Sequence, residues 1–108
     1  MSLGAKLNTL RLRKAESLQA TADAVGITKT HIWELEKGKS SNPTAELLAR
    51  LAAHFEVTVD FLLDAKRDTP SEKDEAAVFF RDLQLLSDKD RATVKEMIRH
   101  FKSSQDDK

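Results

Sequence analysis

The sequence predicts an all-α fold, and three observations favour it. Apolar residues recur at intervals of three and four rather than two, as they do along one face of a helix. Only 3 glycines and 2 prolines interrupt the 108 residues. Serines and threonines stand directly before several of the apolar runs, where their hydroxyls can cap a helix. A chain of this length forms one ordinary domain, or one small domain with an appendage.

The first three predicted helices follow one another closely. The first spans residues 3 to about 14, with leucines on one stripe and basic side chains turned elsewhere. Ser17 can cap a second helix, which Gly26 ends in a left-handed conformation. Thr28 can cap a third helix that runs to about Lys37. Because a single residue separates Gly26 from Thr28, the second and third helices must cross at a steep angle.

A polar loop over residues 38–43 separates these helices from the next two. Thr44 opens a fourth helix, whose broad apolar face marks it as the main core helix. Thr58 can cap a short fifth helix, and the compact unit closes near Asp64. We therefore assign residues 1–64 to a first domain.

The rest of the chain predicts a linker and a helical pair. Residues 65–73 are almost all polar or charged and have little to bury, which is typical of a linker. Ser71 and Ser87 are each followed three residues later by an acid, a pattern close to the capping box that marks helix starts. We assign residues 74–102 to the helical pair. We expect residues 103–108 to be a disordered tail.

Positive and negative charges balance over the whole chain, but they are unevenly distributed along the sequence. Lys+Arg and Asp+Glu both number 18, so the formal net charge is zero. Residues 1–40 hold seven basic and four acidic side chains, a net charge of +3, so the remainder carries −3. A charge of this size gives only a modest attraction to nucleic acid. Specific binding would therefore depend on fitted contacts, and non-specific binding would be weak and sensitive to salt.

Other features exclude several classes of protein. The absence of cysteine excludes disulfides and thiolate chemistry and fits a reducing compartment. The three histidines show no metal-ligand spacing, and His54 and His100 are expected on helix surfaces. No catalytic spacing is present, so we predict a non-enzyme without a metal or a cofactor. No apolar segment is long enough to cross a bilayer and the start lacks a signal-peptide core, so we expect a cytoplasmic protein with no membrane contact.

Two helices joined by a minimal glycine turn, the second with a polar exposed start, form the helix-turn-helix that enters the DNA major groove. Six segments extend this pattern, in order and in correct spacing from Leu7 to Leu63: LxxLR, SLQATADAVGI, THIWELEKGK, NPT, LLARLA and VTVDFLL. Over this range the chain resembles the lambda-repressor-like, or XRE, helix-turn-helix family. The resemblance implies a five-helix DNA-binding domain whose third helix is the recognition helix.

One face of the third helix is free to contact bases if Ile32 and Leu35 face the core. On that face a lysine can donate to guanine, a threonine can lay its methyl against thymine, and a histidine can donate. Trp33 either contacts the DNA backbone or stacks on a neighbouring loop. Glu34 either accepts from cytosine or, as we favour, pairs with a nearby lysine. The candidate base contacts, the first two foremost, are Lys29, Thr30, His31, Trp33 and Glu34.

Phosphate contacts are expected from the start of the second helix and from the loop after the third. The family often carries glutamine directly after the serine that caps its second helix, whereas Leu18 stands there in this chain. The loop before Pro43 is also about one residue longer than the commoner family form, which leaves individual contacts there unassigned. The candidate phosphate contacts are Arg11, Ser17, Gln19, Lys37, Lys39, Ser40, Ser41 and Asn42.

The two tail helices cannot bury their apolar stripes fully against each other. We favour a second copy of the chain as the covering surface, and the alternative is that the tail folds back on the first domain. A twofold dimer would place two recognition helices roughly 34 Å apart, one DNA turn, and would read an inverted repeat. The candidate dimerisation residues are Phe79, Phe80, Leu83, Leu86, Val94, Met97, Ile98 and Phe101.

The function that the sequence predicts is a prokaryotic or phage transcription regulator that binds double-stranded DNA. We expect a repressor that binds an inverted-repeat operator as a homodimer. The apolar tail motivates an alternative from another class, an antitoxin or other regulator whose C-terminal helices bind a partner protein.

Overall fold

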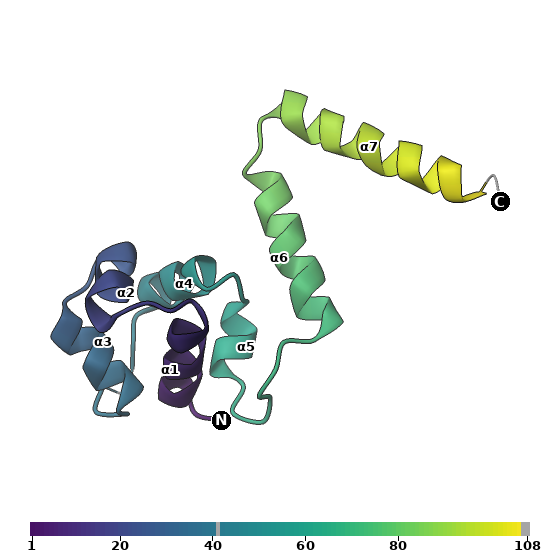
Figure 1. Cartoon of the computed structure of the whole chain (residues 1–108). Coiled ribbons are helices and arrows are strands. Elements are labelled where there is room, and N and C mark those ends of the chain that lie inside the picture. Colours follow the sequence, from purple (N-terminus) through teal and green to yellow (C-terminus); the bar gives the residue numbers. More distant parts are fainter. Residues whose placement is uncertain (41, 107–108) are drawn as a thin grey trace. The chain divides into compact units, whose positions relative to one another are not determined.

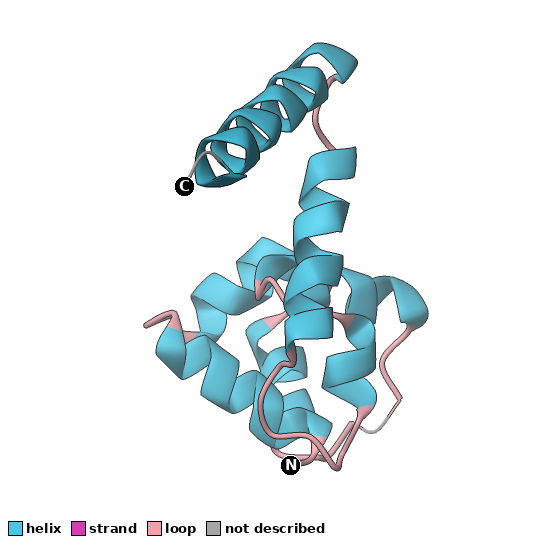
Figure 2. Ribbon diagram, turned by 90° about the vertical axis from the view of Figure 1, so that its right-hand side faces the viewer, coloured by secondary structure: helices cyan, strands magenta, loops and turns pink. Residues whose placement is uncertain are grey.

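The protein is entirely helical in the part that its computed structural model describes, residues 1–40 and 42–106 (Figures 1 and 2). This confirms the predicted fold class. Contacts divide the chain into two units, Met1–Glu75 and Ala76–Lys108. Within the described ranges, no helix is both long and apolar enough to cross a membrane. The helices are α1 (Leu3–Arg13), α2 (Leu18–Val25), α3 (Lys29–Glu36), α4 (Ala45–His54), α5 (Val59–Leu63), α6 (Glu72–Gln84) and α7 (Asp88–Asp106).

The predicted caps form at the start of every helix from α2 to α5. The hydroxyl of Ser17 accepts from the Ala20 amide at 3.0 Å, and Thr28, Thr44 and Thr58 each cap in the same way, three residues before the donor. Each such cap contributes about 1 kcal/mol to helix stability. At the other end of α2, Gly26 adopts the predicted left-handed conformation with φ 75°. The sharp entry into α3 follows from that conformation.

The core of the first unit is a cluster of apolar side chains drawn from all five helices and from the short loop before α5. Leu7, Ile32 and Leu51 have no exposed surface, so α1, α3 and α4 meet at the centre. The two helices of the glycine turn pack on one another, and α1 packs on α3 (Figure 1). The core residues are Leu7, Ala22, Val25, Ile32, Leu35, Leu47, Leu51, Ala52, Phe55, Val57, Phe61 and Leu62.

The backbone of α1 touches the end of α3 at Gly4. A Cβ built on Gly4 would lie 2.5 Å from the carbonyl oxygen of Leu35 and 2.6 Å from that of Glu36. Atoms cannot approach so closely, so only a residue without a side chain allows this spacing. Gly4 therefore fixes the distance between α1 and the C-terminal end of α3.

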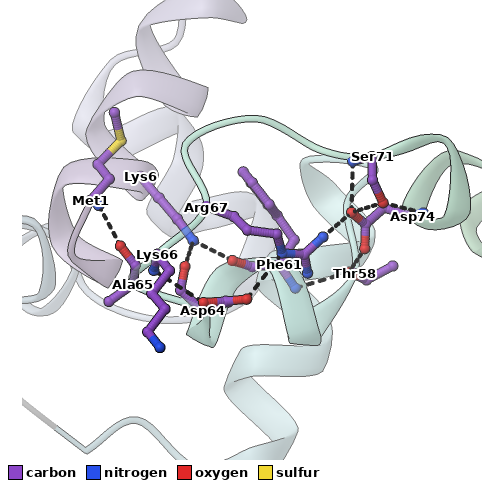
Figure 3. Close-up of polar contacts among 10 residues, drawn as sticks. All are labelled: Met1, Lys6, Thr58, Phe61, Asp64, Ala65, Lys66, Arg67, Ser71 and Asp74. Carbon is purple, nitrogen blue, oxygen red and sulfur yellow. Dashed lines mark hydrogen bonds and ion pairs between the residues drawn. The ribbon is translucent and has the colours of Figure 1, made fainter.

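Lys6 is buried, although the sequence placed the basic side chains of the first helix away from its leucine stripe. It is 1% exposed, and its ammonium donates to the carbonyl oxygens of Phe61 and Asp64 at the end of α5 (Figure 3). The ammonium also lies 4.3 Å from the centre of the Phe61 ring. The last carbonyls of a helix lack intrahelical donors, and the Lys6 ammonium supplies the missing donors here. Burial lowers the pKa of Lys6.

A polar network holds the start of α6 (Figure 3). One carboxylate oxygen of Asp74 accepts from the Ser71 amide at 2.7 Å and from the Ser71 hydroxyl at 2.8 Å, and it pairs with Arg67. Its other oxygen accepts from Thr58 at 3.1 Å. These hydrogen bonds, from the Ser71 backbone above all, outweigh burial and hold the pKa of Asp74 well below its usual range. The capping box predicted at Ser71 is formed.

The stretch 65–73, which the sequence predicted to be a linker, is therefore bonded to the first unit. The terminal amine of Met1 also donates to the Ala65 carbonyl at 2.7 Å. The first unit accordingly extends to Glu75. Sequence reasoning looked for apolar residues to bury, whereas this stretch is held by hydrogen bonds and ion pairs.

In the second unit, Arg91 joins the end of α6 to the start of α7. Its guanidinium donates to three carbonyls, those of Leu83 at 3.3 Å, Gln84 at 3.2 Å and Leu86 at 2.9 Å. Ser87 caps α7 as predicted. The helix then continues to Asp106, whereas the sequence predicted disorder from residue 103, because residues 103–106 contain no glycine or proline to end it. Residues 107–108 of the predicted tail lie outside the described residues.

Candidate nucleic-acid interface

One side of α3 holds the helix to the core and the other side is exposed, as its spacing predicts. Ile32 and Leu35 are buried, 0% and 2% exposed. Lys29, Thr30 and Trp33 are exposed on the other side. His31 and Glu34 are half-buried. The candidate base-reading residues thus share one helix, with the foremost two in its first turn.

The start of α2 completes this surface. Leu18, Lys29, Thr30 and Trp33 line an open hollow of about 280 Å³ between the two helices. Sequence reasoning left Leu18 out of the candidate site. The available signal was an apolar residue directly after the capping Ser17, at the first position of a helix.

Trp33 contacts the loop that follows α3 and also remains on the surface. Its side chain is 37% exposed, and the Lys39 ammonium lies 4.9 Å from its ring centre. A cation over an exposed tryptophan is worth about 0.5–1 kcal/mol. The ring therefore touches the loop, as the second alternative has it, without being covered by it, and contact with the DNA backbone stays a prediction.

The loop after α3 presents unpaired positive charge. Lys37 and Lys39 are exposed, and neither they nor Lys29 forms an ion pair within residues 1–40 and 42–106. Glu34 makes no ion pair in those ranges either, so the favoured pairing with a lysine is not formed there. The Glu34 carbonyl instead accepts from the Lys39 amide at 2.9 Å, and the Lys39 ammonium turns to the indole.

Two further candidates lie in the same loop and one lies outside the described residues. Ser40 is half-buried and its amide donates to the Glu34 carbonyl at 3.3 Å. Asn42 is exposed. Ser41 is not among the described residues.

The start of α2 offers two exposed polar side chains. The Ser17 hydroxyl accepts from within the helix, which leaves its proton available to a phosphate. The amide nitrogen of Gln19 donates to Asp23 at 2.8 Å, so one of its two N–H groups is already engaged.

Arg11 is engaged within the protein and little exposed, which disfavours its expected phosphate contact. It binds Glu36 through two hydrogen bonds, at 2.7 Å and 3.0 Å, and a third N–H donates to the Glu16 carbonyl at 2.9 Å. The two side chains are 12% and 4% exposed. The hydrogen bond to Glu36 raises the pKa of Arg11. Arg11 therefore ties α1 to the end of α3.

The carboxylate of Glu36 anchors the C-terminal end of α3 to α1. Besides Arg11, Asn8 donates to its carboxylate at 2.8 Å. Burial raises the pKa of Glu36, but the hydrogen bonds from Arg11 and Asn8 outweigh burial, and the pKa lies below its usual value. Helix α3 is thus fixed at its C-terminal end by an ion pair that the sequence did not reveal.

His54 is not the surface residue that the sequence predicted. Its Nε2 lies 2.7 Å from the carboxylate of Glu16, which also accepts from Thr21 at 2.9 Å. Burial raises the pKa of Glu16, but the hydrogen bonds from His54 and Thr21 outweigh it and leave that pKa below its usual value. The end of α4 is thereby joined to the start of α2. His100, by contrast, is exposed as predicted.

Residues 2–64 match a family model described as a helix-turn-helix domain. The chain belongs to the helix-turn-helix domain family. The match covers α1 to α5 and confirms the family that the sequence resembles. Over 67 residues the chain is 30% identical to the HTH-type transcriptional regulator SinR of Bacillus subtilis, a match that spans 62% of this chain and 60% of SinR. The chain thus covers less than two thirds of that relative, which is named as a regulator rather than an enzyme.

Two solved structures extend the comparison of this helix-turn-helix protein. One is SinR, the master regulator for biofilm formation, in complex with DNA: TM-score 0.55, 29% identity, 57% of this chain and 98% of that chain. The other is a SinR–SinI protein complex, with TM-score 0.58 and 26% identity over 94% of this chain and 98% of that chain. The second match includes the region of α6 and α7.

Proposed function

We propose that the protein is a DNA-binding transcription regulator that reads its site with α3 in the major groove. The observation that carries the proposal is the division of α3, in which Ile32 and Leu35 are buried while Lys29, Thr30 and Trp33 are exposed. A helix held on one side and polar on the other is what major-groove reading requires. A related domain solved in complex with DNA supports the same use of the fold.

The side chains of this surface suit two different tasks. Lys29 can donate to the guanine acceptors O6 and N7, Thr30 can bond a base or cover a methyl, and His31 and Glu34 flank them. Phosphates would be held by Ser17 and Gln19 at the start of α2 and by the loop after α3, where the described candidates are Lys37, Lys39, Ser40 and Asn42. Arg11 has no part in the proposal.

We further propose that the protein is a repressor that binds an inverted repeat as a homodimer. Phe79, Phe80 and Phe101 are each more than half exposed, and Met97 and Ile98 are about half exposed. Apolar surface of this extent marks an interaction site. The sequence reasoning missed Leu85, which lies between α6 and α7 and is 80% exposed. A twofold dimer through these helices would present two copies of α3 to one face of DNA.

Selection from random duplexes at moderate salt tests the proposal. The expected result is enrichment of a palindromic site. On that site, Lys29→Ala should weaken binding by about 1–3 kcal/mol and relax the preference at one base pair. Lys39→Ala should weaken binding to all sequences alike and lower the salt slope by about one. Lys66→Ala, an exposed lysine outside α2 and α3, is the matched control and should change neither quantity.

A folded protein that enriches no site would refute sequence-specific binding. Equal losses on all sequences for Lys29→Ala and Lys39→Ala would refute the assignment of Lys29 to base reading.

A second candidate function is regulation through a partner protein held by α6 and α7. The same exposed apolar side chains favour it, and the solved complex of SinR with SinI is similar over 94% of this chain. Sedimentation of the full chain separates the two candidates. A dimer that Phe79→Asp and Phe101→Asp both dissociate supports the homodimer. A wild-type chain that stays monomeric at high concentration supports a different protein as the occupant.

A further inference from the structure

We infer that the hollow between α2 and α3 receives the 5-methyl group of a thymine, and that Leu18 makes the protein select that base. The inference rests on the proposed function, because it names one base that the proposed reading surface would prefer. Leu18 stands at the first position of α2, and it lines the hollow together with Lys29, Thr30 and Trp33 of α3.

The chemistry of the lining decides the occupant. Leu18 carries an isobutyl group, Thr30 a methyl group beside its hydroxyl and Trp33 an indole ring, and somewhat more than half of the lining is apolar. In the major groove, thymine alone among the four bases carries an apolar group on its edge, the C5-methyl. The other base edges carry no methyl group and would fill the apolar part of the lining less well.

Lys29 gives the hollow a polar edge and adds a second expectation. Its ammonium can donate to the O6 and N7 acceptors of guanine. A guanine beside the thymine would therefore satisfy the lysine while the methyl group fills the apolar part. The volume of about 280 Å³ is larger than one methyl group, so the hollow admits the edge of a base with its methyl.

The walls of the hollow are held in place before any DNA arrives. Leu18 packs in part against the core, directly after the capping Ser17. Trp33 follows Ile32, which is fully buried, so the backbone that carries the indole is held by the core. Thr30 lies in the first turn of α3, which Thr28 caps. A pocket that needs no ordering on binding turns more of its contact into affinity and selectivity.

The test uses the full chain and the site that it selects from random duplexes. Each thymine of the site is replaced in turn by deoxyuridine, which removes the 5-methyl and keeps the base pair. We expect one thymine in each half-site, beside a guanine, whose replacement weakens binding about fourfold, the effect of one buried methyl group. A 5-methylcytosine at that position should bind more tightly than cytosine, because it restores the methyl alone.

Variants assign the effect to the hollow. Leu18→Ala should bind thymine and deoxyuridine at this position about equally. Thr30→Ser, which removes one methyl from an exposed residue and keeps the hydroxyl, should reduce the ratio in the same direction without risk to folding. Lys37→Ala, an exposed loop lysine that does not line the hollow, should weaken binding but keep the fourfold ratio. Circular dichroism confirms that each variant is folded.

The outcomes separate this inference from the proposed function. If no site is selected, the proposed function fails and the inference falls with it. If a site is selected but no thymine is sensitive to deoxyuridine, the proposed function stands and the inference is wrong. The inference is also wrong if a sensitive thymine keeps its full ratio in both Leu18→Ala and Thr30→Ser.

Discussion

Gly4→Ala sets helix propensity against the packing of α1 on α3. Alanine favours a helix over glycine by up to about 1 kcal/mol, so propensity alone predicts a more stable protein. The structure predicts the opposite. The new Cβ would lie 2.5 Å and 2.6 Å from the carbonyl oxygens of Leu35 and Glu36, and both contacts are with backbone, which cannot rotate away.

The magnitude follows from the two opposing effects. Ordinary contact begins near 3.4 Å, so α1 must move away from α3 by most of an ångström. Overpacking of this kind costs about 1–3 kcal/mol, and contact with backbone places Gly4 in the upper half of that range. After the propensity gain, we expect a net loss of about 1–2 kcal/mol in the free energy of unfolding. The melting temperature should fall by about 4–16 °C.

Thermal and urea unfolding followed by circular dichroism measure the effect. Ala5→Gly is the matched control, because Ala5 is the next residue of α1 and is exposed. It should cost about 0.5–1 kcal/mol through propensity alone. Propensity alone therefore predicts that Gly4→Ala raises the free energy of unfolding and that Ala5→Gly lowers it. With the packing of Gly4 included, both variants should lower it. A Gly4→Ala protein as stable as the wild type, or more so, would refute the reasoning.

Two other predictions concern buried charges. Glu36→Ala leaves the Arg11 guanidinium without its partner, so urea unfolding should show a loss of about 3 kcal/mol, and a loss under about 1 kcal/mol would contradict the role of this ion pair. Asp74 has a folded pKa below its unfolded value of 3.8, so its charge stabilises the fold above about pH 4, and that contribution disappears as the pH falls towards its folded pKa. Between pH 5 and about pH 2, stability should therefore fall less steeply for Asp74→Asn than for the wild type, and parallel urea midpoints for the two proteins would show that Asp74 contributes nothing.

The helix boundaries of the first unit could be predicted because their signals are local. Ser17 and Thr28 lie three residues from the amides that they cap, and Gly26 ends its own helix. Lys6 and Arg11 could not be placed in this way. A basic residue on a short helix gives the same pattern whether it faces water or, as Lys6 does, a carbonyl 55 residues away.

The same contrast between local signals and long-range contacts applies to the candidate site. The exposed row of α3 follows from helical periodicity, so Lys29 and Thr30 could be named from the sequence. Leu18 was missed because its place in the hollow depends on how α2 crosses α3, which spacing alone does not give. The favoured pairing of Glu34 assumed that the nearest lysine would turn to the acid, whereas the Lys39 ammonium lies over Trp33.

The attachment of α3 at one end has a consequence for how such a protein can change. Gly4, Arg11 and Asn8 secure the C-terminal end of the helix. Lys29 and Thr30 at its beginning form no ion pair and no apolar core contact among the residues that the structure describes. Substitutions at the beginning should therefore alter the preferred DNA sequence at little expense in stability. The same scaffold can accept new reading residues one at a time, so duplicated copies can diverge in their targets while each remains folded at every step.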